Sequence, residues 1–314
     1  MSAAAHLSVV PPAPDGDSGS QAGLALRRYS VAAADGTVLE AWTNDVDGPT
    51  VLLCNGLGTN PYTWPALLDP ACGVRVVSWN HRGVAGSARP ADPDRVGVEV
   101  DVEDAVAVLD DAGVDACVVL GWSIGVNSMF ELAVSHPERV TGLFAVAGVP
   151  GDTFGSMGAP MLIPRPLRKP IALGITRALE LAGRPLTAIT SRLPIGPVSG
   201  QVLTHSGFML PVADLDLTRR AVKEFLTTPI DWYMHLARAS SLHSRVSLRT
   251  IDVPTTFVAG TNDILASSHD MGTAAERIPG ASYVELAGTH FLQMEKPAEV
   301  HTLLLELLAR VDAT

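Results

Sequence analysis

The chain has 314 residues, of which 47% are hydrophobic and 18% are charged. This composition supports a large buried core and excludes intrinsic disorder for most of the chain. The formal net charge of −11, from 22 Lys and Arg against 33 Asp and Glu, argues against a nucleic-acid-binding protein, because such a protein needs a basic face to neutralise phosphates.

Residues 1–23 are rich in Ala, Pro, Gly and Ser and lack apolar periodicity, so we expect a flexible N-terminal tail. The segment has no basic region followed by an apolar stretch, unlike a secretory signal. No window reaches about 18 unbroken apolar residues, so no transmembrane span is predicted. We therefore expect a cytoplasmic protein.

Regular patterns begin near residue 26, where 26–33 and 37–44 flank the turn signal Ala-Asp-Gly and predict a β-hairpin. Four further segments are continuously apolar rather than alternating, which is typical of strands buried on both faces of a parallel sheet. They are residues 51–54, 74–79, 116–120 and 140–147. Helical periodicity over 102–112 and 126–133 separates them, so we predict an α/β domain with a mostly parallel sheet.

The cysteines are few and odd in number: Cys54, Cys72 and Cys117. Cys54 and Cys117 lie in predicted strands, where a free thiol behaves as a small core residue. Neither their number nor their spacing favours a disulfide framework or a zinc site, so we predict no metal.

The alternation of strands and helices then stops. Residues 150–250 read as helices interrupted by Pro and Gly, and strands resume at 255–259 and 281–286. We therefore predict one core, residues 24–149 and 251–314, with an inserted helical cap over 150–250. The cap carries 12 Lys and Arg against 6 Asp and Glu, a net charge of +6, so we expect it to attract the acidic core.

The sharpest motif is Gly121-Trp122-Ser123-Ile124-Gly125, which follows a predicted strand and precedes a helical segment. This context predicts a nucleophile on a sharp turn between strand and helix. Small residues on both sides of the serine let strand and helix approach closely. The serine oxygen then lies at a helix N-terminus, where negative charge is stabilised. Ser123 is therefore our predicted nucleophile.

A serine hydroxyl is a poor nucleophile at neutral pH, so it needs a base, and the base needs an orienting carboxylate. Asp263 and His290 each follow a predicted strand in the C-terminal third and are our candidates for acid and base. Asp152, which also follows a predicted strand, is the alternative acid. Asp252 precedes its strand and Asp270 falls within a helix, so both are disfavoured.

Two backbone N–H groups are candidates for binding an oxyanion. One belongs to Ile124, directly after the nucleophile, and the other lies on the loop after 51–54, where we choose Leu57. Asn55 and Gly56 would support that loop. Each such donor contributes about 3–4 kcal/mol to transition-state stabilisation.

With these residues in place, the chain resembles the α/β-hydrolase superfamily, in its capped branch of esterases, lipases, lactonases and cofactor-free haloperoxidases, over residues 26–150 and 250–311. The order Ser, Asp, His along the chain is that of the superfamily. The resemblance implies Ser123 as nucleophile, His290 as base and Asp263 as orienting acid. It also implies a central sheet flanked by helices, with an inserted helical cap and no cofactor.

Two loops extend the resemblance and also depart from it. The segment VVSWNHRGVAGSARP is similar to the D-x-R-G-x-G-x-S loop of the superfamily, with Asn80 where Asp is common. Asn55-Gly56 stands where the superfamily usually has His-Gly before the oxyanion donor. Because the donor is a backbone group, we expect the oxyanion hole to persist while different hydrogen bonds hold its loop.

The apolar residues of the cap would either line a substrate pocket or form the cap's own core. Our candidates for the pocket are Trp122, Met161, Phe208, Trp232, Tyr233 and Phe291. We expect structural or surface roles for His205, His235 and His243.

The sequence predicts a serine hydrolase that cleaves a carboxylic ester, thioester or lactone of a small apolar substrate through an acyl-enzyme. The same residues would serve perhydrolysis, acyl transfer or C–C bond hydrolysis, and a hydrolase-like receptor for a small ligand is the alternative outside enzymes. Dehalogenases and epoxide hydrolases of this superfamily carry Asp at the nucleophile position, so Ser123 argues against both.

A peripheral membrane enzyme is a further alternative, because the cap is basic. Residues 160–171 mix apolar side chains with Arg165, Arg168 and Lys169, although their prolines disfavour a continuous amphipathic helix. The sequence does not specify the oligomeric state.

Overall fold

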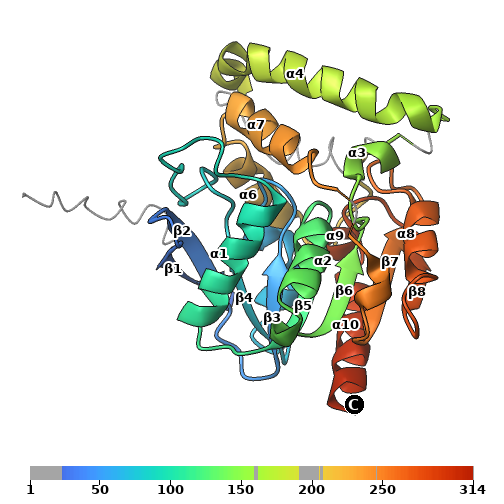
Figure 1. Cartoon of the computed structure of the whole chain (residues 1–314). Coiled ribbons are helices and arrows are strands. Elements are labelled where there is room, and N and C mark those ends of the chain that lie inside the picture. Colours follow the sequence, from blue (N-terminus) through green and yellow to red (C-terminus); the bar gives the residue numbers. More distant parts are fainter. Residues whose placement is uncertain (1–22, 159–161, 191–204, 206–207, 245, 314) are drawn as a thin grey trace, which may run out of the picture.

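A computed structural model describes residues 23–158, 162–190, 205, 208–244 and 246–313. They form a central eight-stranded sheet in the order β1-β2-β4-β3-β5-β6-β7-β8, with helices on both faces (Figure 1). The strands are β1 Arg27–Ala32, β2 Val38–Thr43, β3 Thr50–Cys54, β4 Arg75–Trp79, β5 Cys117–Trp122, β6 Val140–Val146, β7 Thr255–Gly260 and β8 Ser282–Leu286. The β1–β2 and β2–β4 pairs are antiparallel and the remaining pairs are parallel, which confirms the predicted fold class.

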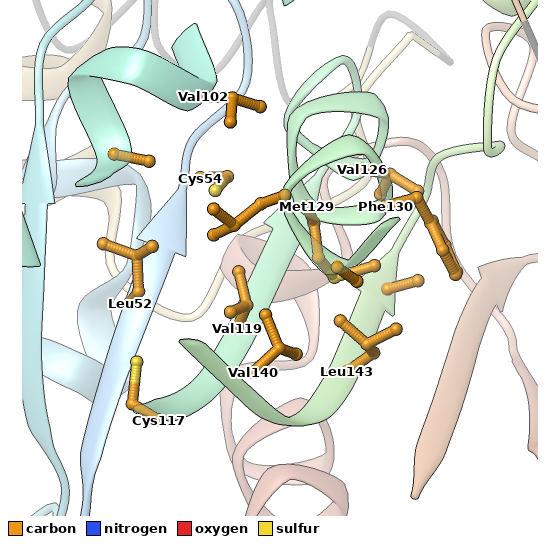
Figure 2. Packing of buried hydrophobic residues seen from close by; sticks show 14 of the residues in the cluster. Leu52, Cys54, Val102, Cys117, Val119, Val126, Met129, Phe130, Val140 and Leu143 are labelled. Carbon is orange, nitrogen blue, oxygen red and sulfur yellow. The ribbon is translucent and has the colours of Figure 1, made fainter. Parts of the chain in front are cut away.

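The strands have continuous apolar sequences because both faces of the sheet are covered. Helices α1 (Val98–Asp111), α2 (Gly125–Ser135) and α8 (Ser268–Ala275) pack on one face, and α10 (Pro297–Asp312) packs on the other. Within β3, Leu52 faces one cluster and Leu53 the other. Figure 2 shows the first cluster, where β3 and β5 residues meet Val126, Met129 and Phe130 of α2.

The two cysteines that we expected in the core are there. Cys54 and Cys117 are buried in the cluster of Figure 2, and Cys72 is buried on the other side of the sheet. All three are free thiols. Burial raises the pKa of the Cys117 thiol to about 11, so this sulfur stays protonated and unreactive.

The loop after β4, which carries the resemblance in Asn80 to Ser87, is fixed by buried charge. Arg82 donates two hydrogen bonds to the buried Asp104 of α1, at 2.9 and 2.7 Å. Asn80, which stands where Asp is common, donates through Nδ2 to Glu40. The loop is therefore rigid, and this matters because the cap rests on it.

The cap lies over the carboxyl ends of the parallel strands, with α4 outermost and α7 beneath it (Figure 1). Its described helices are α3 Thr153–Ser156, α4 Arg165–Thr190, α6 Leu215–Phe225 and α7 Ile230–Ser240. These helices fall inside the predicted insertion, whose bounds of 150–250 stay a prediction. None of the helices in the described part of the chain is both long and apolar enough to cross a membrane.

The expectation that prolines would disfavour a continuous helix over residues 160–171 is wrong from Arg165 onward, since α4 is continuous through Pro170 and Pro185. Pro170 lies in the second turn, so its missing N–H removes only one intrahelical bond there. Packing against α7 compensates: Gly183 comes so close to that helix that a Cβ would lie 2.4 Å from the Asp231 nitrogen. Tertiary contacts thus hold a helix that its local sequence disfavours.

Polar contacts join the cap to the core, and the acidic group belongs to the core in some of them and to the cap in others. His243, which follows α7, lies 3.3 Å from Glu99 and 3.6 Å from Glu131 of the core. Glu224 of α6 accepts from Arg28 of β1 at 2.8 Å. Arg165 of α4 lies 3.7 Å from Asp270 of the core, which is a pair of the kind that we expected, whereas in the Arg28–Glu224 pair the core supplies the cation.

Candidate functional site

The turn between β5 and α2 holds Ser123 in a strained conformation. Its φ is +57°, a left-handed value that non-glycine residues rarely adopt. A Cβ at Gly121 would lie 2.8 Å from the Gly125 carbonyl oxygen, and one at Gly125 would lie 1.9 Å from the carbonyl oxygen of Cys54. Both glycines are therefore required for the sharp turn, which presents the serine hydroxyl above the sheet.

The structure brings Ser123, His290 and Asp263 together across three strand ends. His290 Nε2 lies 2.7 Å from Ser123 Oγ, and His290 Nδ1 lies 2.8 Å from Asp263 Oδ2. The imidazole and the carboxylate are buried, with residue exposures of 5% and 2%. The arrangement gives the serine a base at hydrogen-bond distance and gives the base a fixed orientation.

The two partners of Ser123 are held from behind by further hydrogen bonds. Asp263 Oδ1 accepts from the backbone N–H groups of Leu265 and Ala266 at 2.7 and 2.9 Å. Trp122 Nε1 donates to the carbonyl oxygen of His290 at 3.0 Å. These donors belong to the core and hold the acid and the base of the hydrogen-bonded series.

Sequence reasoning missed Glu295, which lies in the buried turn after His290. Its Oε2 accepts from the Thr289 N–H at 2.8 Å, and its Oε1 accepts from the N–H of Leu210 at 2.8 Å. Glu295 thus connects the histidine loop to the cap. The signal was a carboxylate next to the apolar residues Phe291, Leu292 and Met294 after the histidine, which a buried acceptor would explain.

The competing acids lie elsewhere. Asp152 lies 3.5 Å from Lys169 of α4, and Asp270 lies 3.7 Å from Arg165 of the same helix. Asp252 is exposed before β7. Among the described aspartates, the one placed against the His290 ring is Asp263.

Leu57 lines the cavity beside Ser123, and Ile124 directly follows the serine at the start of α2. In the described part of the chain, neither the Leu57 N–H nor the Ile124 N–H donates a hydrogen bond. The Asn55 side chain holds the loop: its Oδ1 accepts from the Gly56 N–H at 3.0 Å and from Trp64 Nε1 at 3.1 Å. The different side chain at this position therefore still orders the loop and leaves the donors available.

An apolar cavity of about 380 Å³ opens beside Ser123. Core and cap both line it, and four of the predicted pocket residues are present: Trp122, Phe208, Tyr233 and Phe291. Further lining residues are Met209, Ala221, Val222, Phe225, Leu226, Leu265 and Met294. None of the described lining residues is Asp, Glu, Lys or Arg, and burial raises the pKa of Tyr233 to about 12, so the cavity suits a neutral, apolar ligand.

The structure does not bring every predicted residue to this cavity. Trp232 packs on the loop after β4, where its Nε1 donates to the Arg82 carbonyl oxygen at 2.9 Å. It points there because neighbouring residues on a helix project about 100° apart, so Tyr233 faces the cavity and Trp232 does not. Met161 lies outside the described residues.

The cap histidines have structural contacts. His235 Nε2 lies 2.9 Å from the carbonyl oxygen of Pro93, and His243 lies between two core glutamates. His205 is described and is not one of the residues that line the cavity. No group of three or more His, Cys, Asp or Glu within the described ranges is arranged to hold a metal ion.

Comparison with known proteins places the chain among hydrolases. A family model described as alpha/beta hydrolase fold matches residues 49–167. The chain is 28% identical over 303 residues to epoxide hydrolase A of Mycobacterium tuberculosis, covering 84% of this chain and 91% of that protein. Two solved structures show the same fold: an enol-lactonase from Burkholderia xenovorans (TM-score 0.63, 21% identity, 90% and 100% covered) and an esterase from Exiguobacterium antarcticum (TM-score 0.68, 16% identity, 90% and 99% covered).

Proposed function

We propose that the chain is a serine hydrolase of the α/β-hydrolase superfamily, which cleaves a carboxylic ester, thioester or lactone of a small apolar substrate. The observation that carries the proposal is the hydrogen-bonded chain from Ser123 Oγ through His290 to Asp263, placed beside the apolar cavity. A charged substrate would lose its hydration in that cavity without gaining a partner of opposite charge.

In the proposed reaction Ser123 Oγ attacks the substrate carbonyl while His290 Nε2 takes the hydroxyl proton. Asp263 accepts the Nδ1–H of the ring and stabilises the imidazolium that forms. The N–H groups of Leu57 and Ile124 bind the oxyanion. His290 then protonates the leaving atom, which is the alkoxide oxygen of an ester or lactone or the thiolate sulfur of a thioester. Afterwards it activates water, which releases the acid and restores Ser123.

The epoxide hydrolase relative points to a different bond, and Ser123 argues against it. A carboxylate that opens an epoxide forms an ester, whose carbonyl water can attack. A serine that opened an epoxide would form an ether, which has no carbonyl for that second step. Transfer of the acyl group to peroxide or to another alcohol uses the same acyl-enzyme and differs only in the acceptor.

Labelling with a fluorophosphonate probe tests the proposal on wild type and Ser123→Ala. We expect labelling of the wild type alone, because only an activated serine reacts with the probe. Turnover of p-nitrophenyl esters from acetate to palmitate should favour short and medium chains, since the cavity of about 380 Å³ lies near the small end of ligand sites. Folded wild type that neither labels nor turns over any ester would favour the ligand-receptor alternative.

We also propose the cytoplasm as the compartment. The three cysteines are buried free thiols, a state that a reducing compartment maintains. The proposed partner is a small-molecule substrate alone, without a cofactor.

A further inference from the structure

Helix α4 presents an apolar stripe on the outer side of the cap. It is the outermost element of the molecule and lies across α7 (Figure 1). The exposed apolar side chains are Leu167 (51%), Ile171 (43%), Ile175 (56%), Leu181 (89%) and Ile189 (61%). At about 3.6 residues per turn these positions share one side of the helix. Scattered exposed apolar residues are ordinary, but a stripe along a 26-residue helix is typical of an interaction surface.

The opposite side of α4 is already engaged with the protein. Its buried residues are Thr176 and Gly183. Thr187 Oγ1 accepts a hydrogen bond from the Ile230 N–H at 2.8 Å and so caps the start of α7. These contacts fix the rotation of α4 about its axis, and the apolar stripe is left facing outward.

Cations flank the stripe. The helix carries five basic residues and one acidic residue, a net charge of +4, in Arg165, Arg168, Lys169, Arg177, Arg184 and Glu180. Arg177 and Arg184 are exposed and lie beside the stripe, the latter with 91% of its side chain accessible. Glu180 lies on the inner side, where it accepts from Arg238 of α7 at 3.2 Å.

We propose that α4 docks the protein on an anionic lipid surface, with the apolar stripe in the interfacial region and the flanking arginines at the headgroup phosphates. Arg165 and Lys169 lie near Asp270 and Asp152 of the same chain, so the argument from charge rests on the exposed Arg177 and Arg184. Charge favours lipid over a second copy of the chain, because two α4 helices packed stripe to stripe would bring these exposed arginines of both copies together. Arginine stems can cover the apolar surface while their guanidinium groups reach phosphate. This inference does not depend on the proposed reaction.

Vesicle flotation of the full chain tests the proposal. We expect flotation with vesicles of phosphatidylglycerol and phosphatidylcholine in equal parts, none with phosphatidylcholine alone, and weaker binding as salt rises. Ile171→Glu/Ile175→Glu should abolish binding. Arg177→Ala/Arg184→Ala should weaken it by about five-fold for each arginine removed. Leu305→Glu, at a leucine of α10 that is 41% exposed, is the matched control and should bind as wild type.

Thermal unfolding and hydrolysis of a soluble ester show whether each variant is folded, since none of these residues lines the cavity. Absence of flotation with anionic vesicles would overturn the proposal. So would flotation of Ile171→Glu/Ile175→Glu at the wild-type level. A dimer in analytical ultracentrifugation that this variant dissociates, together with no flotation, would assign the stripe to a second copy instead. The arginine variant and the salt series keep the test valid if the glutamate variant is unfolded.

Discussion

The core and the cap of this molecule are stabilised in different ways. In the core, strands such as β5 are buried along their whole length, and close backbone contacts fix the position of Ser123. In the cap, the 26 residues of α4 bury only Thr176 and Gly183, and polar pairs such as Arg28–Glu224 tie the layer to the sheet. If both of our proposals hold, the core would carry out the reaction, while the cap would select the substrate and dock the protein on lipid.

The largest effect is expected from the core acid. Asp263→Asn should lower kcat about 10⁴-fold, because an amide leaves the imidazole in the wrong tautomer while keeping the geometry. Asp152→Asn, the alternative acid, should retain activity within a few-fold. Initial rates on a p-nitrophenyl ester, with thermal unfolding as the check on folding, measure both. An Asp263→Asn enzyme within ten-fold of wild type would show that another group orients His290.

Replacing a glycine by alanine should change the free energy of unfolding in opposite directions in the core and in the cap. Gly125→Ala places a methyl group 1.9 Å from the Cys54 carbonyl oxygen and should destabilise the protein by about 3 kcal/mol or more. Gly174→Ala in α4 meets nothing within 4 Å and should stabilise it by about 0.5–1 kcal/mol through helix propensity. Urea unfolding at equilibrium gives both values. Equal changes in unfolding free energy for Gly125→Ala and Gly174→Ala would contradict the proposed difference in packing between core and cap.

His81 and Asp101 form a buried pair in the core, and their contributions to the pH dependence of stability should partly cancel. His81 Nε2 lies 3.8 Å from Asp101 Oδ2, and both side chains are buried. Burial lowers the pKa of His81 from 6.5 to about 4, so its contribution to stability is complete above pH 6.5 and is lost as the pH falls to about 4. Burial raises the pKa of Asp101, so its contribution has the opposite slope.

Removing Asp101 should reveal the pH dependence of stability that His81 contributes. Asp101→Asn leaves His81 alone and should lose up to about 3 kcal/mol of unfolding free energy between pH 6.5 and 4, relative to its value at pH 7. Wild type should change less over the same range. Urea titrations at fixed pH values compare the two proteins. Parallel pH profiles for wild type and variant would contradict the assignment of a neutral His81.

How far the sequence predicts this molecule also differs between core and cap. Continuous apolar runs identify the strands, and the flanking glycines single out Ser123 as the candidate nucleophile, because backbone packing dictates those residues directly. The sequence favours Asp263 and leaves Asp152 as an alternative, and only the structure shows the N–H groups that hold Asp263 beside His290. In the cap, Trp232 and Tyr233 are adjacent and apolar, and the orientation of α7 alone decides which one lines the cavity. Local patterns carry no information about that rotation.

The smallest effect concerns the tie between β1 and α6. Arg28 Nη2 lies 3.0 and 2.8 Å from the two carboxylate oxygens of Glu224, and the side chains are 28% and 19% exposed. Glu224→Gln should cost about 1 kcal/mol of unfolding free energy, because the pair is partly screened by solvent and Arg28 keeps Glu40 at 2.7 Å.

The same change should raise KM more than it lowers kcat, since the next residue, Phe225, lines the cavity while no catalytic group contacts Glu224. Asp216→Asn is the matched control on α6, because its pair with Arg219 at 3.1 Å leaves the carboxylate 85% exposed and should contribute nothing measurable. Urea unfolding gives the change in unfolding free energy for both variants, and ester kinetics give their kcat and KM. A kcat loss in Glu224→Gln as large as that in Asp263→Asn would mean that the cap positions the catalytic residues, and the separation of roles between cap and core would then be wrong.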